Sequence, residues 1–238
     1  MYNGKSVSVI LLAAGASTRM GSNKMLLDFG GLSPIDLCIK AFIDFADEFL
    51  ITYSADTYSK VEAACSHIQV PFKLVQGGNT RQESVYNALC ESSCEIVAVH
   101  DCARCLVTKE IIRSSIESAI EFGCGIASTR VTDTIRNTET GDTVDRDSLI
   151  AAQTPQSFRR TDLLRSYNSA NKSFTDDAAV YKSNGGVLYY SKGSTENLKL
   201  TRPDDIGLFK AILALREESL CFVSGSVKTH TGSRRAGN

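Results

Sequence analysis

The sequence shows no excess of either charge sign and contains no long apolar run. Its 238 residues include 26 Lys and Arg against 27 Asp and Glu, which gives a formal net charge of -1. This balance excludes the strongly basic surface of a typical nucleic-acid-binding protein, so any phosphate binding must be local. No apolar stretch has the length of a membrane span, and residues 1–6 are polar, unlike a signal peptide. We therefore expect a cytoplasmic protein without nucleic-acid or membrane partners.

Both standard glycine-rich nucleotide motifs are also absent. The P-loop requires a glycine, four further residues and then Gly-Lys-Ser/Thr, and the dinucleotide fingerprint requires three spaced glycines. The sequence contains neither pattern. A phosphate-binding loop in this chain must therefore be built differently.

Eight cysteines are present, but the other features of the chain do not favour a disulfide-rich secreted fold. Hydrophobic residues make up 42% of the chain, which is enough for an ample core. Free thiols are therefore the expected state. Cys102 and Cys105 form a CxxC pattern downstream of Cys90 and Cys94, so a zinc site stays open as an alternative. The predicted strand at 96–99 would separate the two pairs.

The apolar residues alternate between strand-like and helical periods along the chain. The predicted strands span residues 7–12, 48–54, 72–76, 96–100, 125–129 and 187–190. The predicted helices span residues 35–45, 58–66, 81–89, 109–122, 162–171, 176–183 and 203–218. This order predicts an α/β fold, a doubly wound and mostly parallel sheet with helices on both faces.

One internal segment and the C-terminal end depart from this alternation. Residues 133–156 contain a turn-forming run at 137–142, which is typical of a β-arm inserted in the domain. Residues 224–238 are rich in Gly, Ser and Lys/Arg, so we expect a disordered tail there. Residues 1–223 would then form a single domain.

The loop that follows the first predicted strand has the composition of a polyphosphate-binding loop. Small residues at Ala13, Ala14 and Gly15 let backbone amides approach an anion closely. Arg19 and Lys24 add positive charge beside these donors. An ordinary connection with two solvated cations is the alternative interpretation of this segment alone.

His100 and Asp101 are expected at the same edge of the sheet, because ligands in such sheets bind beyond the carboxyl ends of the strands. Asp101 ends a predicted buried strand and could bind Mg²⁺ or cap the next turn. The preceding His100 is more typical of a structural imidazole. After the Gly77-Gly78 turn, Asn79 and Ser84 could contact a base and its ribose.

These residues belong to seven sequence blocks that occur in one order and spacing. The blocks are LAAGASTRMG (12–21) with Lys24, GGNTRQESV (77–85), VHDCAR (99–104), VTDTI (131–135), QTPQ (153–156), TDDA (175–178) and NLKLT (197–201). With them the chain from 7 to 215 resembles the methylerythritol phosphate cytidylyltransferase family. Such a set is far more specific than any single motif.

The resemblance implies a Rossmann-like domain whose β-arm builds a homodimer, and an enzyme that uses CTP. The reaction would join CMP to 2-C-methyl-D-erythritol 4-phosphate and release pyrophosphate, in non-mevalonate isoprenoid biosynthesis. The family's cofactor is Mg²⁺, which Asp101 would bind.

The resemblance also assigns roles to individual residues. The catalytic residues would be Arg19, Lys24 and Lys199. The nucleotide would be bound by Ala13, Ala14, Gly15, Gly78, Asn79, Ser84, Asp101 and Cys102. The polyol phosphate would be bound by Arg104, Thr154 and Thr175, with Val131 and Thr132 reaching across from the partner's arm.

The chain departs from the family pattern at four positions. Cys102 replaces the usual Ala and Cys105 the usual Pro, and Arg130 stands where Pro is frequent. Thr132 occupies a position at which some members carry a phosphate-binding Arg, so Arg130 is a candidate to supply the missing charge. If the Cys102 thiol borders the nucleotide, its modification should slow turnover.

Two alternative functions stay open from the sequence. Ribitol phosphate cytidylyltransferases share the chemistry and many of the blocks, although Ala14 in place of a second Gly favours the methylerythritol acceptor. An inactive nucleotide-binding module is the alternative of another class. The presence of Arg19, Lys24, Asp101 and Lys199 argues against it.

Overall fold

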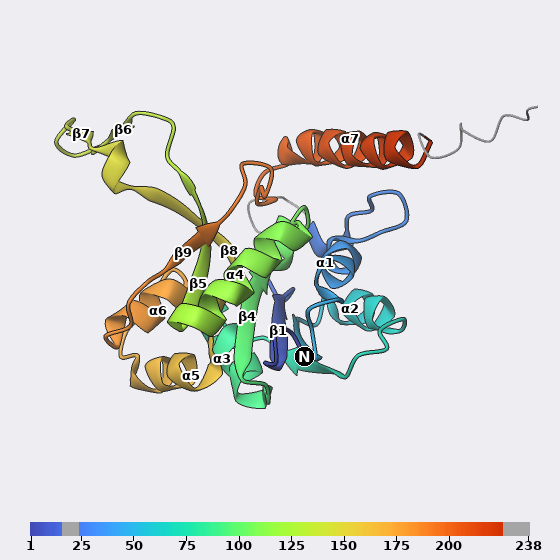
Figure 1. Ribbon diagram of the computed structural model, residues 1–238, viewed down its shortest axis with the longest axis horizontal. Helices are drawn as coiled ribbons and strands as arrows, with labels where there is room; N and C mark the ends of the chain where they lie inside the picture. The colour runs from blue at the N-terminus through green and yellow to red at the C-terminus, as the bar shows by residue number, and fades with distance from the viewer. Residues whose placement is uncertain (16–23, 226–238) are drawn as a thin grey trace, which may run out of the picture.

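The computed structural model describes residues 1–15 and 24–225 of the chain. Its centre is a seven-stranded sheet with the order β3-β2-β1-β4-β8-β5-β9 (Figure 1). The strands are β1 (Val7–Leu12), β2 (Glu48–Tyr53), β3 (Phe72–Gln76), β4 (Ile96–Asp101), β5 (Cys124–Arg130), β8 (Ile150–Arg159) and β9 (Tyr190–Lys192). The first four strands are parallel to one another, β9 is parallel to β5, and only β8 runs antiparallel to its neighbours. The prediction of a mostly parallel α/β sheet is confirmed.

Helices cover both faces of this sheet and enclose two hydrophobic cores. The α-helices are α1 (Pro34–Phe42), α2 (Tyr58–Cys65), α3 (Arg81–Glu91), α4 (Lys109–Phe122), α5 (Arg160–Ser169), α6 (Asp177–Ser183) and α7 (Asp205–Gly225). Side chains alternate along each strand, so Val9 and Leu11 of β1 pack with α1, α2, α4 and α7. The intervening Ile10 packs in the second core with α3, α5 and α6. This alternation accounts for the apolar runs that predicted the strands.

Strand β8 is the main element that the sequence prediction missed, because residues 150–156 were expected in the arm. The structure instead inserts β8 between β4 and β5, pairing Ile96 with Arg159 and Ile126 with Gln156. The interior positions from 153 to 157 are buried but carry Gln, Thr, Pro, Gln and Ser. A buried strand made of polar residues gives no hydrophobic signal.

The β-arm is correspondingly shorter than predicted. It contains the small antiparallel pair β6 (Ile135–Arg136) and β7 (Thr143–Val144), followed by the short 3-10 helix η4 (Arg146–Ser148). Figure 1 shows this arm projecting from the body beyond the paired ends of β5 and β8. The described arm residues are mostly exposed.

Helix α7 also differs from the prediction, since it continues to Gly225 and not only to residue 218. The rest of the predicted tail, 226–238, lies outside the described residues. No helix in the described ranges combines the length and apolar character needed to cross a membrane.

Candidate functional site

A cavity of about 420 Å³ opens at the carboxyl ends of the four parallel strands. The residues that line it come from the ends of β1, β2 and β4, the 3-10 helix η2 (Lys24–Leu26), the β3–α3 turn and the segment after β9. They are Leu12, Ala13, Ala14, Gly15, Lys24, Met25, Thr52, Gly78, Asn79, Thr80, Arg81, Ser84, Asp101, Ala103 and Lys199. Segments far apart in the sequence thus meet at the edge that the sequence predicted.

The first wall of the cavity is the chain that leaves β1. Ala13 is buried, and its backbone amide donates a hydrogen bond of 3.1 Å to the Thr52 hydroxyl. The same hydroxyl donates to the Leu11 carbonyl at 3.4 Å, which ties β2 to this wall. Arg19, the other predicted cation of the loop, lies outside the described residues.

The second wall is the turn between β3 and α3. The Ser84 hydroxyl accepts a hydrogen bond from the Gly78 amide at 3.0 Å and donates to the Thr80 carbonyl at 2.9 Å. Thr80 caps α3 by accepting from the Glu83 amide. Ser84 therefore fixes the shape of the turn, while Asn79 is exposed at the mouth of the cavity.

Gly77 and Gly78 permit this turn to pack tightly. A Cβ atom on Gly77 would lie 2.4 Å from the Cβ of Ala14, in the first wall. One on Gly78 would lie 2.3 Å from the Cβ of Glu83. Both distances are far below van der Waals contact, so Gly77 lets the two walls of the cavity come together and Gly78 lets the turn pack against the start of α3.

Asp101 is held on both of its carboxylate oxygens. Oδ1 accepts a hydrogen bond from Arg81 Nε at 3.1 Å, and Oδ2 accepts from Lys199 Nζ at 2.6 Å. Burial alone would raise the pKa of this carboxyl, but the charges of Arg81 and Lys199 outweigh it and lower the pKa. Asp101 is therefore an anion at neutral pH.

Arg81 also forms a bidentate salt bridge with a second carboxylate. Its Nη1 and Nη2 atoms donate to Oδ1 and Oδ2 of Asp177 at 3.2 and 2.8 Å. Burial opposes the charge of the guanidinium, but Asp177 and Asp101 together raise its pKa. This bidentate pair fixes both the position and the plane of the guanidinium.

A chain of hydrogen bonds behind Asp101 connects it to β8. The Asp101 amide donates to the Thr154 hydroxyl at 3.1 Å, and that hydroxyl lies 3.2 Å from His100 Nδ1. His100 Nε2 lies 3.2 Å from the Arg104 carbonyl. Burial lowers the pKa of His100 to about 4, so the ring is neutral and its Nε2–H donates to that carbonyl. The expectation of a structural imidazole is consistent with this geometry.

Two lysines converge on the cavity from separate elements. Lys24, at the start of η2, donates through Nζ to the Leu200 carbonyl at 3.3 Å. Lys199 is the residue before Leu200, whose amide donates to the Ala103 carbonyl at 2.8 Å. Both lysines therefore line the cavity, Lys24 bonded to the backbone of the segment that carries Lys199, and Lys199 bonded to Asp101.

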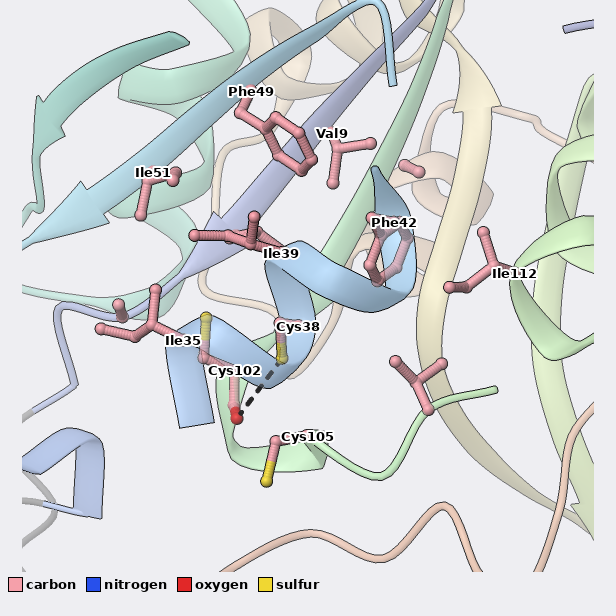
Figure 2. Packing of buried hydrophobic residues seen from close by; sticks show 14 of the residues in the cluster. Val9, Ile35, Cys38, Ile39, Phe42, Phe49, Ile51, Cys102, Cys105 and Ile112 are labelled. Atoms are coloured by element: carbon pink, nitrogen blue, oxygen red, sulfur yellow. Dashed lines mark hydrogen bonds between the residues drawn. The ribbon is translucent and has the colours of Figure 1, made fainter. Parts of the chain in front are cut away.

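Cys102 contributes no side chain to this cavity, although the resemblance placed it among the nucleotide-binding residues. Its side chain is fully buried in the core under α1, where the Cys38 Sγ–H donates to the Cys102 carbonyl at 3.8 Å (Figure 2). Cys105 lies in the same core, and burial raises the pKa of its thiol to about 12. The predicted thiol at the nucleotide edge is therefore not found, and the hypothesis of an oxidation-sensitive site loses its basis.

The predicted acceptor-binding residues are more dispersed. Thr154 is buried behind Asp101, and Thr175 is exposed before α6. Val131 and Thr132 follow the end of β5 at the base of the arm. None of these four residues is among those that line the described cavity.

Arg104 is partly buried beside the segment that carries Lys199. Its Nη1 donates to the Asn197 carbonyl at 2.7 Å. Its Nε is buried and finds no hydrogen-bond partner among the described residues. A buried guanidinium N–H without an acceptor is unusual and indicates a further partner, such as a water molecule or an anion.

The sequence prediction overlooked Arg81, Asp177 and Thr52. Arg81 and Asp177 lie inside the GGNTRQESV and TDDA blocks. The blocks therefore contained both residues, but they did not predict a role for either of them. Thr52 carried no signal, because it lies within the mostly apolar strand β2.

The zinc alternative gains no support from the described part of the chain. No group of three or more His, Cys, Asp or Glu side chains there is arranged to hold a metal ion. Cys102 and Cys105 are buried, whereas Cys90 is exposed on α3.

Comparison with known proteins gives one consistent family. The profile of 2-C-methyl-D-erythritol 4-phosphate cytidylyltransferase matches residues 7–215. The enzyme of that name from Bacillus licheniformis is 34% identical over 218 residues, which cover 86% of this chain and 94% of the relative. The one from Caldanaerobacter subterraneus is 36% identical over 217 residues, which cover 84% and 96%.

Solved structures give the same result at the level of the fold. The crystal structure of 2-C-methyl-D-erythritol 4-phosphate cytidylyltransferase from Thermus thermophilus superposes with a TM-score of 0.74 at 29% identity. The similarity covers 87% of this chain and 98% of that one. A structure from Anaerococcus prevotii has a TM-score of 0.79 at 23% identity, which bears on the fold alone.

Proposed function

The chain belongs to the 2-C-methyl-D-erythritol 4-phosphate cytidylyltransferase family, and from this membership we propose that it transfers CMP from CTP to 2-C-methyl-D-erythritol 4-phosphate. The products are 4-diphosphocytidyl-2-C-methyl-D-erythritol and pyrophosphate, and the reaction is a step of non-mevalonate isoprenoid biosynthesis. The observation that carries the proposal is the cavity in which Lys24, Asn79, Asp101 and Lys199 meet from four separate sequence blocks.

The nucleotide is bound in this cavity. The backbone of Ala13, Ala14 and Gly15 faces the phosphates, since small residues leave the amides accessible. Gly78 and Asn79 contact the cytosine, with Ser84 holding their turn in shape. The cavity volume of about 420 Å³ suits a nucleotide-sized ligand.

The reaction is an in-line displacement at the α-phosphate of CTP. An oxygen of the acceptor phosphate forms the new P–O bond, and the bond to pyrophosphate breaks. That oxygen is largely ionised at neutral pH, because the second pKa of a phosphate monoester is about 6. No general base is needed, so catalysis consists of positioning and charge stabilisation.

The positive side chains supply that stabilisation. Lys24 and Lys199 lie on the cavity wall, and both gain negative partners as charge grows on the phosphate oxygens. We assign Arg19 the same task on the basis of its sequence block, although it lies outside the described residues.

A divalent cation fits the chemistry of Asp101. Mg²⁺ is commonly held by one or two carboxylates together with substrate phosphates. Asp101 is an ionised carboxylate on the cavity wall, and the Lys199 ammonium at Oδ2 marks a position that favours positive charge. Asp101 would hold Mg²⁺ together with the nucleotide, and the ion would neutralise part of the phosphate charge.

The acceptor phosphate binds near Arg104, whose buried Nε lacks a partner among the described residues. Thr154 and Thr175 are assigned to the same acceptor site from their sequence blocks, and Cys102 would act through its backbone alone. Val131 and Thr132 of a second subunit complete it, with Arg130 as the candidate for an additional phosphate contact.

We therefore propose a homodimer that forms through the arm. The arm projects from the body, and its apolar Ile135 is 37% exposed. An exposed hairpin with apolar side chains favours burial against another chain.

The location is proposed as cytoplasmic, which agrees with free thiols at the seven cysteines whose side chains the structure describes.

The test is the release of pyrophosphate by the full chain with CTP, Mg²⁺ and a panel of polyol phosphates. ATP, GTP and UTP serve as controls for the base. We expect release with CTP and 2-C-methyl-D-erythritol 4-phosphate together. Release with ribitol 5-phosphate alone would contradict the acceptor, and no release with any acceptor would indicate a nucleotide-binding module.

A further inference from the structure

A line of hydrogen-bonded polar side chains runs from α5 to the nucleotide cavity. It begins at Tyr167 on α5, whose hydroxyl donates to Asp177 Oδ1 at 2.6 Å. Asp177, at the start of α6, has no exposed surface and grips Arg81 with both oxygens. Arg81 in turn donates to Asp101. Only the last two of these four residues line the cavity.

This arrangement restricts the guanidinium of Arg81 to one orientation. Three of its N–H donors point at two different carboxylates, so rotation about the last side-chain bonds would break contacts on both sides. The Tyr167 hydroxyl restricts Asp177 by a charge-assisted hydrogen bond. Arg81 thereby keeps Asp101 Oδ1 occupied and leaves Oδ2 to Lys199.

The same contacts decide how the site responds when a nucleotide arrives. Lys199 is 38% exposed and can exchange Asp101 for a phosphate oxygen. Arg81 cannot leave so easily, because Asp177 is fully buried and would lose its cationic partner. Asp101 therefore keeps one fixed cation while the other is released.

We propose that Tyr167 and Asp177 are positioning residues of the nucleotide site, acting through Arg81 to hold the Asp101 carboxylate in one orientation. The inference rests on the proposed function, since that function assigns Asp101 to the nucleotide and its metal ion. Neither residue touches the cavity, so their effect reaches the nucleotide only through the Arg81 guanidinium.

The chain offers a matched pair of tyrosines for the test. Tyr167→Phe removes the hydroxyl that orients Asp177. Tyr86→Phe removes the hydroxyl of the ring that stacks on Tyr167, with centroids 6.1 Å apart. The Tyr86 hydroxyl donates to exposed Asn168 and has no contact with Asp177. The two variants therefore make the same chemical change on and off the proposed line.

For Tyr167→Phe we expect the Kd of CTP to rise about tenfold and kcat to fall, as is typical for groups that orient a ligand-binding side chain. The KM of the acceptor should stay unchanged. A loss of folded protein alone would alter neither the Kd of CTP nor this KM, so a change in the Kd reports on the nucleotide site. Tyr86→Phe should match the unmodified protein in all three constants. Equal CTP affinities of the two variants, with the fold intact by circular dichroism, would overturn the proposal.

Asp177→Asn provides a second measurement, because it keeps the shape but removes the charge that grips Arg81. We expect a larger loss of CTP affinity than for Tyr167→Phe, measured on the folded fraction by calorimetry. Undiminished CTP binding in this variant would also contradict the proposal. Calorimetry of CTP needs no acceptor, so this result stands apart from the test of the reaction itself.

Discussion

At the scale of single residues, the site is a set of cations around one ionised carboxylate. Lys199 and Arg81 already satisfy Asp101 before a nucleotide is bound, so the carboxylate is not left as a buried unpaired charge. Lys24 lies on the wall of the same cavity, and its ammonium donates to the Leu200 carbonyl. Its charge therefore stands where the proposed function places the phosphates.

Replacing Lys24 should accordingly reduce turnover and leave the fold intact. For Lys24→Ala we expect kcat to fall by more than about tenfold, because the loss of one charge-stabilising donor typically has this effect or a larger one. Pyrophosphate release at saturating CTP measures it. Lys40→Ala, on the exposed side of α1, is the control and should retain normal turnover. Normal turnover in Lys24→Ala would remove Lys24 from the catalytic residues.

His100 should make the stability of the protein depend on pH. Its pKa is about 4 in the folded chain and 6.5 in the ordinary state. Between these values the unfolded chain binds a proton that the folded chain excludes, so stability falls as pH falls. From pH 7 to pH 5 the expected loss from this group is about 2 kcal/mol.

Urea unfolding at the two pH values tests this expectation. His100→Gln should be less stable at pH 7 but should lose less stability on acidification than the unmodified chain. His67→Gln, at an exposed position on the surface, should keep the full pH dependence. An identical pH dependence in His100→Gln and the unmodified chain would refute the assignment.

At the scale of elements, the cavity exists because two connections pack against each other without side chains between them. The β3–α3 turn meets the chain leaving β1 at Gly77 and Ala14. The separation of the two walls thus depends on a missing Cβ atom.

Gly77→Ala should therefore weaken nucleotide binding. The added Cβ would lie 2.4 Å from Ala14 and 3.1 Å from the Ser84 hydroxyl, so the turn must shift away from the first wall. We expect the Kd of CTP to rise about tenfold, since misplaced binding groups lose affinity on this scale. Gly207→Ala in α7 has open space around its Cβ and should bind CTP normally. Equal CTP affinity in both variants would argue against the close approach.

The elements that the sequence predicted are those that are buried through apolar side chains. β1, β3 and α4 were predicted with their observed bounds, and in β1 and α4 this is because Val, Ile and Leu recur at the period of the element. β8 was missed, since Gln153, Thr154 and Gln156 are buried through hydrogen bonds and not through apolar packing.

Part of the candidate site could also be predicted from the sequence. The loop after β1 and Asp101 come at strand ends, and strand ends of a parallel sheet meet at one edge. The grip of Asp177 on Arg81 joins residues 96 positions apart, and no local pattern encodes such a pair. The burial of Cys102 depends on which way the 3-10 helix η3 (Cys102–Arg104) turns after β4, which the sequence also leaves open.

At the scale of the whole molecule, the proposed homodimer depends on the arm. Replacing residues 133–148 by a two-glycine turn should leave the seven-stranded sheet in place, because these residues lie outside it. We expect sedimentation to change from a dimer to a monomer. CTP binding should persist, whereas the KM of the acceptor should rise steeply, since Val131 and Thr132 of the partner would no longer reach it. A dimer that survives the deletion would contradict the proposed role of the arm.

The place of β8 in the sheet has a consequence for synthesis on the ribosome. β5 is made before β8, yet its neighbour toward β4 in the sheet is β8, so a nascent chain that ends after β5 cannot extend the sheet beyond β4. Such a chain exposes the edge of β4, and an unpaired strand edge of this kind favours aggregation. Thr154 emerges only with β8 itself, and Asp177 and Lys199 emerge after it. A prematurely terminated product therefore carries most of the residues that line the cavity, but it lacks Lys199 and the Asp177 carboxylate that holds Arg81 in place.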